Sequence, residues 1–407
     1  MRVKIKDVAK QIRGVSYKPT DVVDTLSDDS IVLLRSNNIN DGSINLSDVV
    51  YVNKQKIKEA QLLKKGDILI CASSGSKNLV GKSAYIDKNL QMAFGAFCKV
   101  VRPISGNARY LGYFFESPFY RCRISNASAG ANINNIRTED INNLEVEWPN
   151  LETQNQIAII FDKVTTLIAL RKQQLDKIDE LVKSRFVELF ENDNNNWPIT
   201  HIGDIASVSV GVVIKPAQFY TTKDEGVPAF RSLNVGELCI KDKEWVYFNR
   251  EGNLLNSKSI VQAGDVLVIR SGAPGLACVV TPEFAGYNVI DLIIAHPDKA
   301  IINSIFLAAF TNFGSGRNQI SRMIGGAAQK HINVGRYKSL ILKLPPKNLQ
   351  DQFANFIQQL DKSKLAVQKS LVNWKFLRNL SCSSTSADEN PRPAMAFMAG
   401  CEFFCYA

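Results

Sequence analysis

The sequence predicts an α+β protein built from two tandem, pseudo-symmetric globules, each followed by a long α-helix. Three observations predict this fold. Residues repeat along the chain at a nearly constant offset of 196. The first part of each copy carries short strand-like runs between Gly, Ser and Asn residues, and the second part carries an apolar stripe with heptad spacing. With 407 residues, the chain is also longer than a single hydrophobic core usually allows.

The internal repeat is the strongest of these signals, because matches that stay in register over a long stretch are typical of a duplicated unit. Small insertions shift the offset to 197 for Gly14 with Gly211 and to 198 for Gly66 with Gly264. The matches at 196 include Arg35–Ser36 with Arg231–Ser232, Asn38 with Asn234, Val50–Tyr51 with Val246–Tyr247, Ile124–Ser125 with Ile320–Ser321, Gly130–Ala131 with Gly326–Ala327, Ile136 with Ile332, Pro149 with Pro345, and Gln156 with Gln352.

The repeat sets the domain boundaries. Globules are predicted at residues 1–150 and 193–346, and long helices at residues 151–192 and 347–380. We expect Phe94, Phe97 and the run Tyr113–Phe115 to lie in the core of the first globule, because large aromatic side chains usually do. Residues 381–407 abandon the helical pattern, so a disordered tail without function is expected there.

Both long helices carry a similar apolar stripe. A helix of about 36 residues is roughly 54 Å long, which exceeds the width of the neighbouring globule. Such a helix projects from its globule, and two similar stripes in one chain can bury each other as an antiparallel coiled coil. The stripes are Ile157, Phe161, Val164, Ile168, Leu175, Ile178, Val182 and Leu189 in the first helix, and Phe353, Ile357, Leu360, Val367, Leu371 and Trp374 in the second.

The composition indicates a partner class and a compartment. Lys and Arg outnumber Asp and Glu by 49 to 39, a net charge of +10, which favours a polyanion such as nucleic acid. No run of 18 apolar residues is present, so no membrane association is expected. The cysteines are scattered rather than arranged as a disulfide framework, and the first residues do not resemble a signal peptide, which predicts a cytoplasmic protein.

Motifs for catalysis are poorly represented, so we expect no catalytic residues, no metal site and no cofactor on this chain. The segment from Gly75 to Ser83 resembles a phosphate-binding P-loop, but it has one residue too many between its glycines and a strand-like run follows it. The histidines His201, His296 and His331 are far apart, and none has a counterpart in the other copy. No Gly-x-Ser-x-Gly motif for a hydrolase is present.

The residues that do recur are rich in hydrogen-bond donors and suit contacts with DNA. Arg can donate two hydrogen bonds to guanine, and Asn or Gln can pair with adenine, while Lys and Ser contact phosphates. Each could equally cap a helix or complete a turn. The candidates in the first copy are Tyr17, Lys18, Arg35, Ser36, Asn37, Asn38, Ser74, Lys77, Asn78, Lys82, Asn132, Asn134 and Asn135. Those in the second copy are Lys215, Arg231, Ser232, Asn234, Arg270, Ser271, Gln329, Lys330 and His331.

Two divergent globules, each followed by a long helix, resemble the specificity (S) subunit of type I restriction-modification systems. The resemblance covers about residues 1–380. It includes a Gly-Asp pair, an apolar strand and a Ser/Gly turn in both copies, at Gly66–Gly75 and Gly264–Gly275. The segment Gly130–Ile136 leading to Trp148–Ile157 also resembles the family, and the second copy has Leu344–Pro346 and Gln352–Phe353 in that place. The second helix departs from the pattern near Leu380.

The resemblance implies that each globule is a target recognition domain for one half of a bipartite site in double-stranded DNA, and that the paired helices set the spacer length. It also implies that the helices dock two methyltransferase (M) subunits, and that restriction (R) subunits join the complex. The S subunit is then not an enzyme, and S-adenosylmethionine, ATP and Mg²⁺ are expected on the partner subunits. The helix residues assigned to subunit binding are Ile157, Phe161, Val164, Ile168, Phe353, Ile357 and Leu360.

Two other functions fit the same sequence features. The chain could be the recognition subunit of another class of restriction or methylation enzyme, which predicts the same DNA binding with different partners. It could also be a coiled-coil scaffold that binds only protein, which predicts no sequence-selective DNA binding and no effect of substituting Arg35 or Arg231. The repeated donor-rich segments favour the DNA-binding alternatives.

Overall fold

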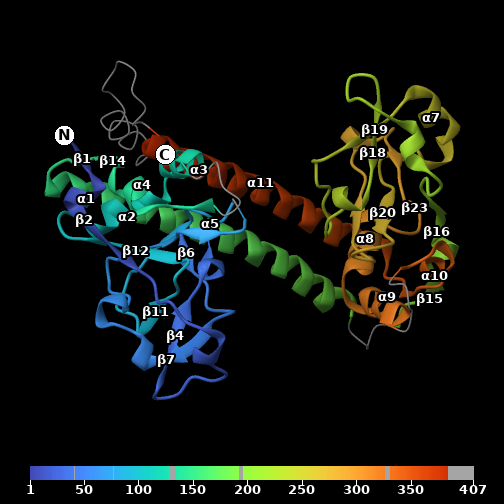
Figure 1. Cartoon of the computed structure of the whole chain (residues 1–407). Helices are drawn as coiled ribbons and strands as arrows, with labels where there is room; N and C mark the ends of the chain where they lie inside the picture. Colours follow the sequence, from blue (N-terminus) through green and yellow to red (C-terminus); the bar gives the residue numbers. More distant parts are fainter. Residues whose placement is uncertain (41, 77, 128–133, 192–195, 326–330, 384–407) are drawn as a thin grey trace. The chain divides into compact units, whose positions relative to one another are not determined.

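The computed structural model describes residues 1–40, 42–76, 78–127, 134–191, 196–325 and 331–383 (Figure 1). The chain divides into two compact units. Unit 1 consists of residues 1–172 and the described residues from Lys369 onward, and unit 2 consists of residues 173–368. Two long helices, α5 (Leu151–Phe190) and α11 (Lys347–Ser383), each contribute one part to each unit. Secondary structure is mixed helix and sheet throughout the described residues.

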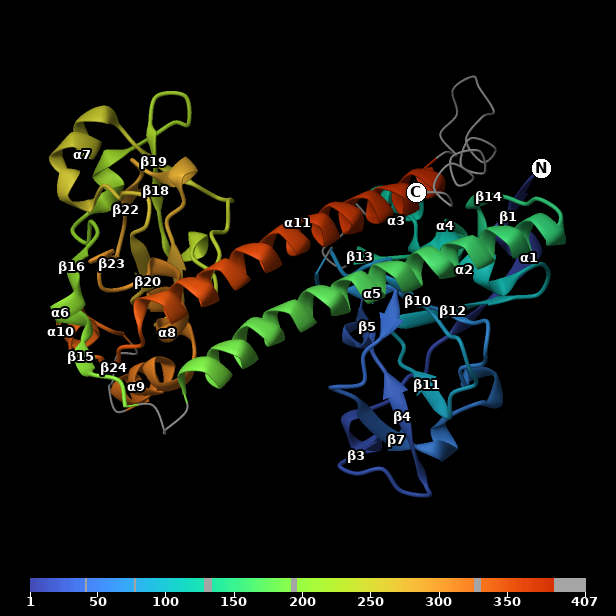
Figure 2. The ribbon, with the colours of Figure 1, turned by 180° about the vertical axis from the view of Figure 1, so that it is seen from behind.

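The globule of unit 1 contains two four-stranded sheets. The first has the order β10 (Ser83–Tyr85), β8 (Ile68–Cys71), β12 (Cys98–Pro103), β2 (Ala9–Arg13), and the second has the order β11 (Met92–Phe94), β4 (Ser30–Leu34), β7 (Val50–Asn53), β3 (Val22–Val23). All neighbours are antiparallel except β11 and β4, which are parallel. Figures 1 and 2 both show the second sheet on the side of the first that faces away from α5.

In the described part of this globule, three short strand pairs and four α-helices accompany the two sheets. The strand pairs are β1 (Arg2–Lys4) with β14 (Glu145–Glu147), β5 (Ile39–Asn40) with β6 (Ser43–Ile44), and β9 (Ser73–Ser74) with β13 (Asn134–Asn135). The helices are α1 (Ile5–Val8), α2 (Ala108–Glu116), α3 (Pro118–Ala127) and α4 (Thr138–Asn142). Apolar side chains of α2, α3 and the first sheet form the largest core cluster, which includes Ile70, Val101, Leu111, Phe115 and Tyr120.

The globule of unit 2 repeats this topology. Its first sheet has the order β16 (Ala206–Val210), β23 (Leu292–Pro297), β20 (Val266–Ile269), β21 (Ala277–Val279), and its second has the order β17 (Tyr220–Thr221), β19 (Val246–Phe248), β18 (Val227–Phe230), β22 (Asn288–Val289). Strand β15 (Ile199–His201) pairs with β24 (Ile341–Lys343). The helices are α6 (Ile202–Ile205), α7 (Arg250–Leu255), α8 (Ser304–Asn312), α9 (Gly314–Gly325) and α10 (Val334–Lys338).

Within unit 2, the end of α5 and the start of α11 pack together against α8. The rings of Phe186 and Phe353 are 5.7 Å apart, and the rings of Phe190 and Phe306 are 4.8 Å apart. About two turns before Phe186 on α5 and three turns after Phe353 on α11, Asp179 and Lys364 form an ion pair. Because the residue numbers rise along one helix as they fall along the other, the two segments run antiparallel in this unit.

The repeated glycines Gly14 and Gly211 mark a close approach of two backbones. A Cβ atom at Gly14 would lie 2.0 Å from the carbonyl oxygen of Gly95, and one at Gly211 would lie 2.4 Å from that of Val289. Neither distance leaves space for a side chain. The repeat therefore preserves these glycines for a steric reason that is the same in both globules.

Candidate nucleic-acid interface

The Arg-Ser-Asn-Asn segment after β4 forms a tight turn around a short 3-10 helix, Ser36–Asn38. Asn38 is 1% exposed, and its Oδ1 accepts a hydrogen bond of 2.7 Å from the backbone N–H of Arg35. Its Nδ2 donates to the carbonyl oxygens of Asn45 and Asp48, each at 2.8 Å. The guanidinium of Arg35 donates to the carboxylate of Asp48 at 2.8 Å. These side chains hold the loop in its shape.

The second copy builds the same turn after β18. Asn234 is 0% exposed, its Oδ1 accepts from the backbone N–H of Arg231 at 2.9 Å, and its Nδ2 donates to the carbonyl oxygens of Lys241 and Lys243 at 3.3 and 2.7 Å. The prediction that Asn38 and Asn234 contact DNA does not fit this structure. Both amides are buried and already engaged with loop backbone, so neither has a group free for a base edge.

The Ser/Gly turn after β8 and β20 is closed by the same backbone hydrogen bond in both copies. The N–H of Gly81 donates to the carbonyl oxygen of Cys71 at 2.8 Å, and the N–H of Gly275 donates to that of Ile269 at 2.9 Å. Strand β10 follows the first turn, whereas a P-loop needs a helix N-terminus there. The turn therefore joins two strands of a sheet and presents its middle residues to solvent.

Two arginines that the sequence analysis missed support these turns. Arg121 donates to the carbonyl oxygens of Val80 at 2.5 Å and Asn78 at 2.9 Å, and Arg317 donates to the carbonyl oxygen of Pro274 at 2.5 Å. The two arginines occupy equivalent positions at the offset of 196, so the repeat itself carried the signal that could have found them.

Two predicted segments that are far apart in sequence lie side by side. Strand β9 (Ser73–Ser74), which begins the Ser/Gly turn, pairs with strand β13 (Asn134–Asn135). In the second globule, Ser271 forms the equivalent bridge with His331. The structure thus brings the turn and the donor-rich segment together on one face of each globule.

The loop between β11 and β12 lies against the same turn. Strands β4 and β11 are parallel and end together, and the N–H of Gly95 donates to the carbonyl oxygen of Leu34 at 2.9 Å. Phe97 accepts hydrogen bonds at its carbonyl oxygen from the N–H groups of Ala72 at 2.8 Å and Ser73 at 3.0 Å. We use the name loop face for the surface formed by these segments. In globule 1 it comprises residues 35–37, 72–76, 78–81, 95–97 and 134–135; in globule 2 it comprises residues 231–233, 270–275, 290–291 and 331.

The loop face of globule 2 has the same backbone connections but different side chains. The N–H of Ile290 donates to the carbonyl oxygen of Phe230 at 2.8 Å. The guanidinium of Arg270 donates to Oδ1 of Asp291 at 2.7 Å, and its side chain is 15% exposed. In globule 1 the equivalent positions hold Ala72 and Phe97. The frame is therefore shared, while the chemistry that it presents differs.

The remaining predicted DNA contacts differ in exposure. Lys18, Asn37, Asn78, Asn135, Lys215, Ser232 and Ser271 are exposed, and Tyr17, Arg35, Ser36, Ser74, Lys82, Arg231, Arg270 and His331 are partly buried. Lys77, Asn132, Gln329 and Lys330 lie outside the described residues, as does the side chain of Asn134.

The core prediction for aromatic residues is correct in part. Phe94, Tyr113 and Phe115 are buried, with at most 3% of their surface exposed. Phe97, by contrast, is 67% exposed. Its place in the core was wrong because strand alternation turns Cys98 inward at the start of β12 and Phe97 outward.

The predicted subunit-binding residues are mostly covered by the chain itself. Phe161, Val164, Ile168, Phe353 and Ile357 are between 1% and 6% exposed, and Ile157 and Leu360 are partly buried. Phe161, for example, packs on Tyr113 of α2 with ring centroids 4.9 Å apart. These five side chains are therefore covered in the folded chain, and their assignment to subunit binding stays a prediction.

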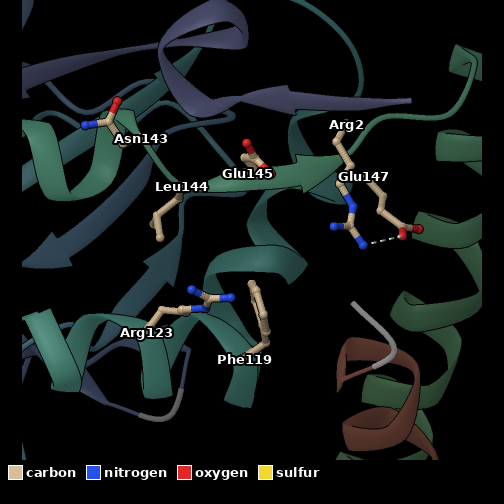
Figure 3. Close-up of a pocket in the computed structure, with 7 residues that line it drawn as sticks. All are labelled: Arg2, Phe119, Arg123, Asn143, Leu144, Glu145 and Glu147. Atoms are coloured by element: carbon tan, nitrogen blue, oxygen red, sulfur yellow. Dashed lines mark ion pairs between the residues drawn. The ribbon is translucent and has the colours of Figure 1, made fainter. Parts of the chain in front are cut away.

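A pocket of about 170 Å³ in globule 1 lies between α3 and the β1–β14 pair (Figure 3). Arg2 and Glu147 form an ion pair of 3.8 Å at its rim. In unit 2 the corresponding space is lined by Phe186 and Phe190 from the end of α5. The pocket contains none of the residues predicted to contact DNA. It is lined by Arg2, Phe119, Arg123, Asn143, Leu144, Glu145 and Glu147.

Within the described part of the chain, no group of three or more His, Cys, Asp or Glu side chains is arranged to hold a metal ion. Burial raises the pKa of the Cys71 thiol to about 11, so this cysteine beneath the loop face is protonated at neutral pH. No helix among the described residues is long and apolar enough to cross a membrane.

Comparison with known families gives an independent assignment. The profile of the type I restriction modification DNA specificity domain matches this chain twice, at residues 1–180 and 188–373. The chain belongs to the type I restriction-modification DNA specificity family. The two matches follow the internal repeat, and membership of the specificity family places the function of this chain in DNA target recognition.

Curated members of the specificity family are similar over nearly the whole chain. The type I restriction enzyme StySPI specificity subunit of Salmonella potsdam is 30% identical over 403 residues, covering 91% of this chain and 83% of that protein. The EcoKI specificity subunit of Escherichia coli K12 is 28% identical over 400 residues, with the same coverage. The MjaIX specificity subunit of Methanocaldococcus jannaschii is 21% identical, covering 81% of this chain and 79% of that protein.

Solved structures support the fold of the specificity family. The type I S subunit from M. genitalium superimposes with a TM-score of 0.56 at 14% identity, covering 96% of each chain. A chain from a study of complex assembly and conformational transition in a type I system gives a TM-score of 0.59 at 15% identity, covering 93% of this chain and 95% of that chain. At these identities the likeness concerns the fold alone.

Proposed function

We propose that this chain is the DNA sequence-recognition subunit of a type I restriction-modification complex, in which each globule reads one half of a bipartite target in double-stranded DNA. The observation that carries the proposal is the loop face, which is built twice on a similar backbone frame with different side chains. Two unlike readers on equivalent frames suit two unlike half-sites.

The electrostatics of the chain support a DNA partner. The net charge is +10, and exposed lysines lie in both globules, including Lys18 and Lys215. Contacts of such lysines with phosphates provide salt-dependent affinity, and contacts with base edges provide selectivity. Affinity that falls steeply with salt concentration is the expected signature of this division of roles.

The long helices would set the distance between the two half-sites. Helix α5 has 40 residues, which corresponds to about 60 Å. The antiparallel contacts of Phe186 with Phe353 and of Asp179 with Lys364 in unit 2 support pairing of α5 with α11 as a coiled coil. A pair of helices of fixed length is stiff enough to act as a ruler for the spacer.

The partners in this proposal are two M subunits, with R subunits joining to form the restriction complex. Methylation with S-adenosylmethionine, and cleavage with ATP and Mg²⁺, would belong to those partners, and this chain would contribute no catalytic residue. Five of the seven helix residues assigned to subunit binding from the sequence are buried. We therefore place the M-subunit contacts on exposed apolar residues of the helices. Among the helix side chains that the structure describes, the exposed apolar residues are Leu151, Ile159, Leu170, Leu181, Val187, Leu365, Val372 and Phe376.

The decisive experiment is to co-express this chain with the methyltransferase subunit encoded beside it and to map methylated adenines in the host DNA by single-molecule sequencing. A split, asymmetric motif that disappears when this chain is deleted is the expected result. Exchanging residues 1–150 for another such domain should then change one half of the motif only. A complex that assembles without any such motif would instead indicate a protein-binding scaffold.

A further inference from the structure

Phe97 is an exposed aromatic side chain on the loop face of globule 1. Its exposure of 67% is the largest of any Phe whose exposure the structure describes, while Phe94, three residues earlier, is 0% exposed. A single exposed apolar residue is common on protein surfaces. The surroundings of Phe97 set it apart from such residues.

The backbone that carries Phe97 is fixed on both sides. The N–H of Cys98 donates to the carbonyl oxygen of Gly95 at 2.8 Å, which closes a tight turn around Ala96 and Phe97. The carbonyl oxygen of Phe97 accepts from the N–H groups of both Ala72 and Ser73. The ring is therefore presented to solvent by a turn with little freedom, so its binding to a partner costs little conformational entropy.

Polar and basic residues lie next to Phe97 in the fold. Ser73 and Asn135 are register partners in the β9–β13 pair, and the N–H of Ser73 donates to the carbonyl oxygen of Phe97. On β12, Lys99 lies two residues after Phe97, and its Nζ donates to the carbonyl oxygen of Ile136 at 2.8 Å. Arg13 on the neighbouring strand β2, the register partner of Lys99, is exposed. The strands next to Phe97 thus carry hydrogen-bonding groups suited to base edges and a positive charge suited to a phosphate.

We propose that Phe97 makes an apolar contact with a base of the half-site that globule 1 reads, and that it is a specificity-determining residue of this globule. This inference rests on the proposed function of the chain. The chemistry it requires is the apolar part of a base, which is either the C5-methyl group of a thymine in the major groove or the face of an unstacked base.

The second globule supports the assignment by contrast. The register of β12 with β8 and of β23 with β20 makes Asp291 the equivalent of Phe97, and Arg270 the equivalent of Ala72. An ion pair of 2.7 Å between Arg270 and Asp291 therefore occupies the place of the aromatic residue. The two equivalent positions thus hold an apolar pair in globule 1, Ala72 and Phe97, and a charged pair in globule 2, Arg270 and Asp291. Such a difference fits positions that select different bases in the two half-sites.

The test uses the complex with its own methyltransferase subunit and a DNA duplex that contains the mapped target. Phe97→Ala should weaken binding to the target by about tenfold or more and relax methylation at one position of the first half-site, while binding to unrelated DNA stays unchanged. The matched control is Ile104→Ala. Ile104 flanks the other end of β12 with a similar exposure of 59%, and its truncation should change neither quantity.

Modified bases distinguish the two forms of the contact. Replacing each thymine of the first half-site by deoxyuridine should weaken binding of the wild-type complex, but not of the Phe97→Ala complex, if the ring contacts a methyl group. Quenching of 2-aminopurine at one position by the wild-type protein alone indicates stacking on a base face. Either result supports the inference. A Phe97→Ala complex with unchanged affinity and an unchanged motif overturns it and leaves the proposed function intact, whereas a wild-type complex without any selective target overturns both.

Discussion

The side chain of Gln154 at the start of α5 accepts a hydrogen bond of 2.8 Å at Oε1 from the backbone N–H of Asn107, which caps α2. Gln350 at the start of α11 repeats this bond with Asn303 at 2.8 Å, and both glutamines are at most 1% exposed. The side-chain amides of Gln154 and Gln350 thus attach each long helix to its own globule in the same way. The same side chains also donate through Nε2 to the carbonyl oxygens of Pro149 at 2.9 Å and Pro345 at 2.8 Å.

Gln154→Leu and Gln350→Leu should each destabilise the unit concerned by about 2–3 kcal/mol. Each substitution removes the partner of a backbone N–H, that of Asn107 or Asn303, and of a proline carbonyl oxygen at the start of the long helix. Denaturant unfolding of the isolated chain measures this change. The controls are Gln156→Leu and Gln352→Leu, two residues further along each helix, where both side chains are exposed. Equal effects at the buried and exposed glutamines would show that the amide bonds have no special role.

Phe353 joins α11 to α5 and to globule 2. Phe353 is 1% exposed, and the centroid of its ring lies 5.7 Å from that of Phe186 and 5.3 Å from that of Phe190. Phe353→Ala should lower the free energy of unfolding of unit 2 by about 3–5 kcal/mol through the cavity that it leaves. Phe376→Ala on the same helix, where the ring is 59% exposed, should change it by less than about 1 kcal/mol. Thermal unfolding of both variants tests this difference.

His296 gives globule 2 a pH dependence that globule 1 lacks. Its Nδ1 lies 2.7 Å from Oδ1 of Asp265, and this hydrogen bond raises the pKa of His296, against the opposing effect of burial. Because the folded-state pKa is raised, the stabilisation is complete below the unfolded value of 6.5 and is lost as the pH rises through the folded pKa. In globule 1 the equivalent residue is Arg102, whose Nε and a terminal nitrogen donate to Asp67 at 2.7 Å.

His296→Arg should therefore remove this loss of stability, since the guanidinium stays charged throughout the range. Chemical denaturation at about pH 6 and about pH 8.5 compares the two proteins, and a proton NMR titration of the His296 ring gives the shifted pKa directly. A wild-type protein whose ring titrates at or below 6.5 would contradict the contribution of Asp265.

The sequence predicted the duplication and the two long helices because both leave periodic signals. The helix predicted at residues 151–192 corresponds to α5, Leu151–Phe190, and that predicted at residues 347–380 to α11, Lys347–Ser383. Such patterns depend only on residue spacing along one chain. The repeat also showed that Gly14 and Gly211 are equivalent. The reason for the glycine at each position, a carbonyl oxygen that leaves no space for a side chain, became visible only in the structure.

The roles of individual side chains could not be predicted in the same way. Arg35 and Asn38 recur in the second copy because they hold a loop, and a structural residue repeats as faithfully as a functional one. Phe97 has no aromatic counterpart in the second copy, and large aromatic side chains such as this one usually lie in the core, whereas Phe97 is exposed. Whether the residue just before a short strand faces solvent depends on how that strand, here β12, pairs with β8, and the local sequence does not encode this register.

The ion pair of Arg270 with Asp291 predicts a change confined to the second half-site. Arg270→Ala combined with Asp291→Ala removes both charges and leaves no unpaired ion on the loop face. Methylation mapping should then show altered or relaxed selectivity in the half-site of globule 2, with that of globule 1 unchanged. A loss of methylation at all sites would indicate instead that the pair supports folding or assembly.

The spacer between the half-sites should follow the length of the helices. Duplicating residues 158–164 in α5 and the equivalent residues 354–360 in α11 adds one heptad to each helix and keeps the apolar stripe in phase. Seven residues lengthen a helix by about 10 Å, which equals roughly three base pairs of DNA. Methylation mapping should therefore give the same two half-sites with a spacer longer by about three base pairs. Insertion into α5 alone leaves the helices unequal and should abolish selective methylation. An unchanged spacer after the double insertion would remove the ruler role from the helices and assign it to the partner subunits.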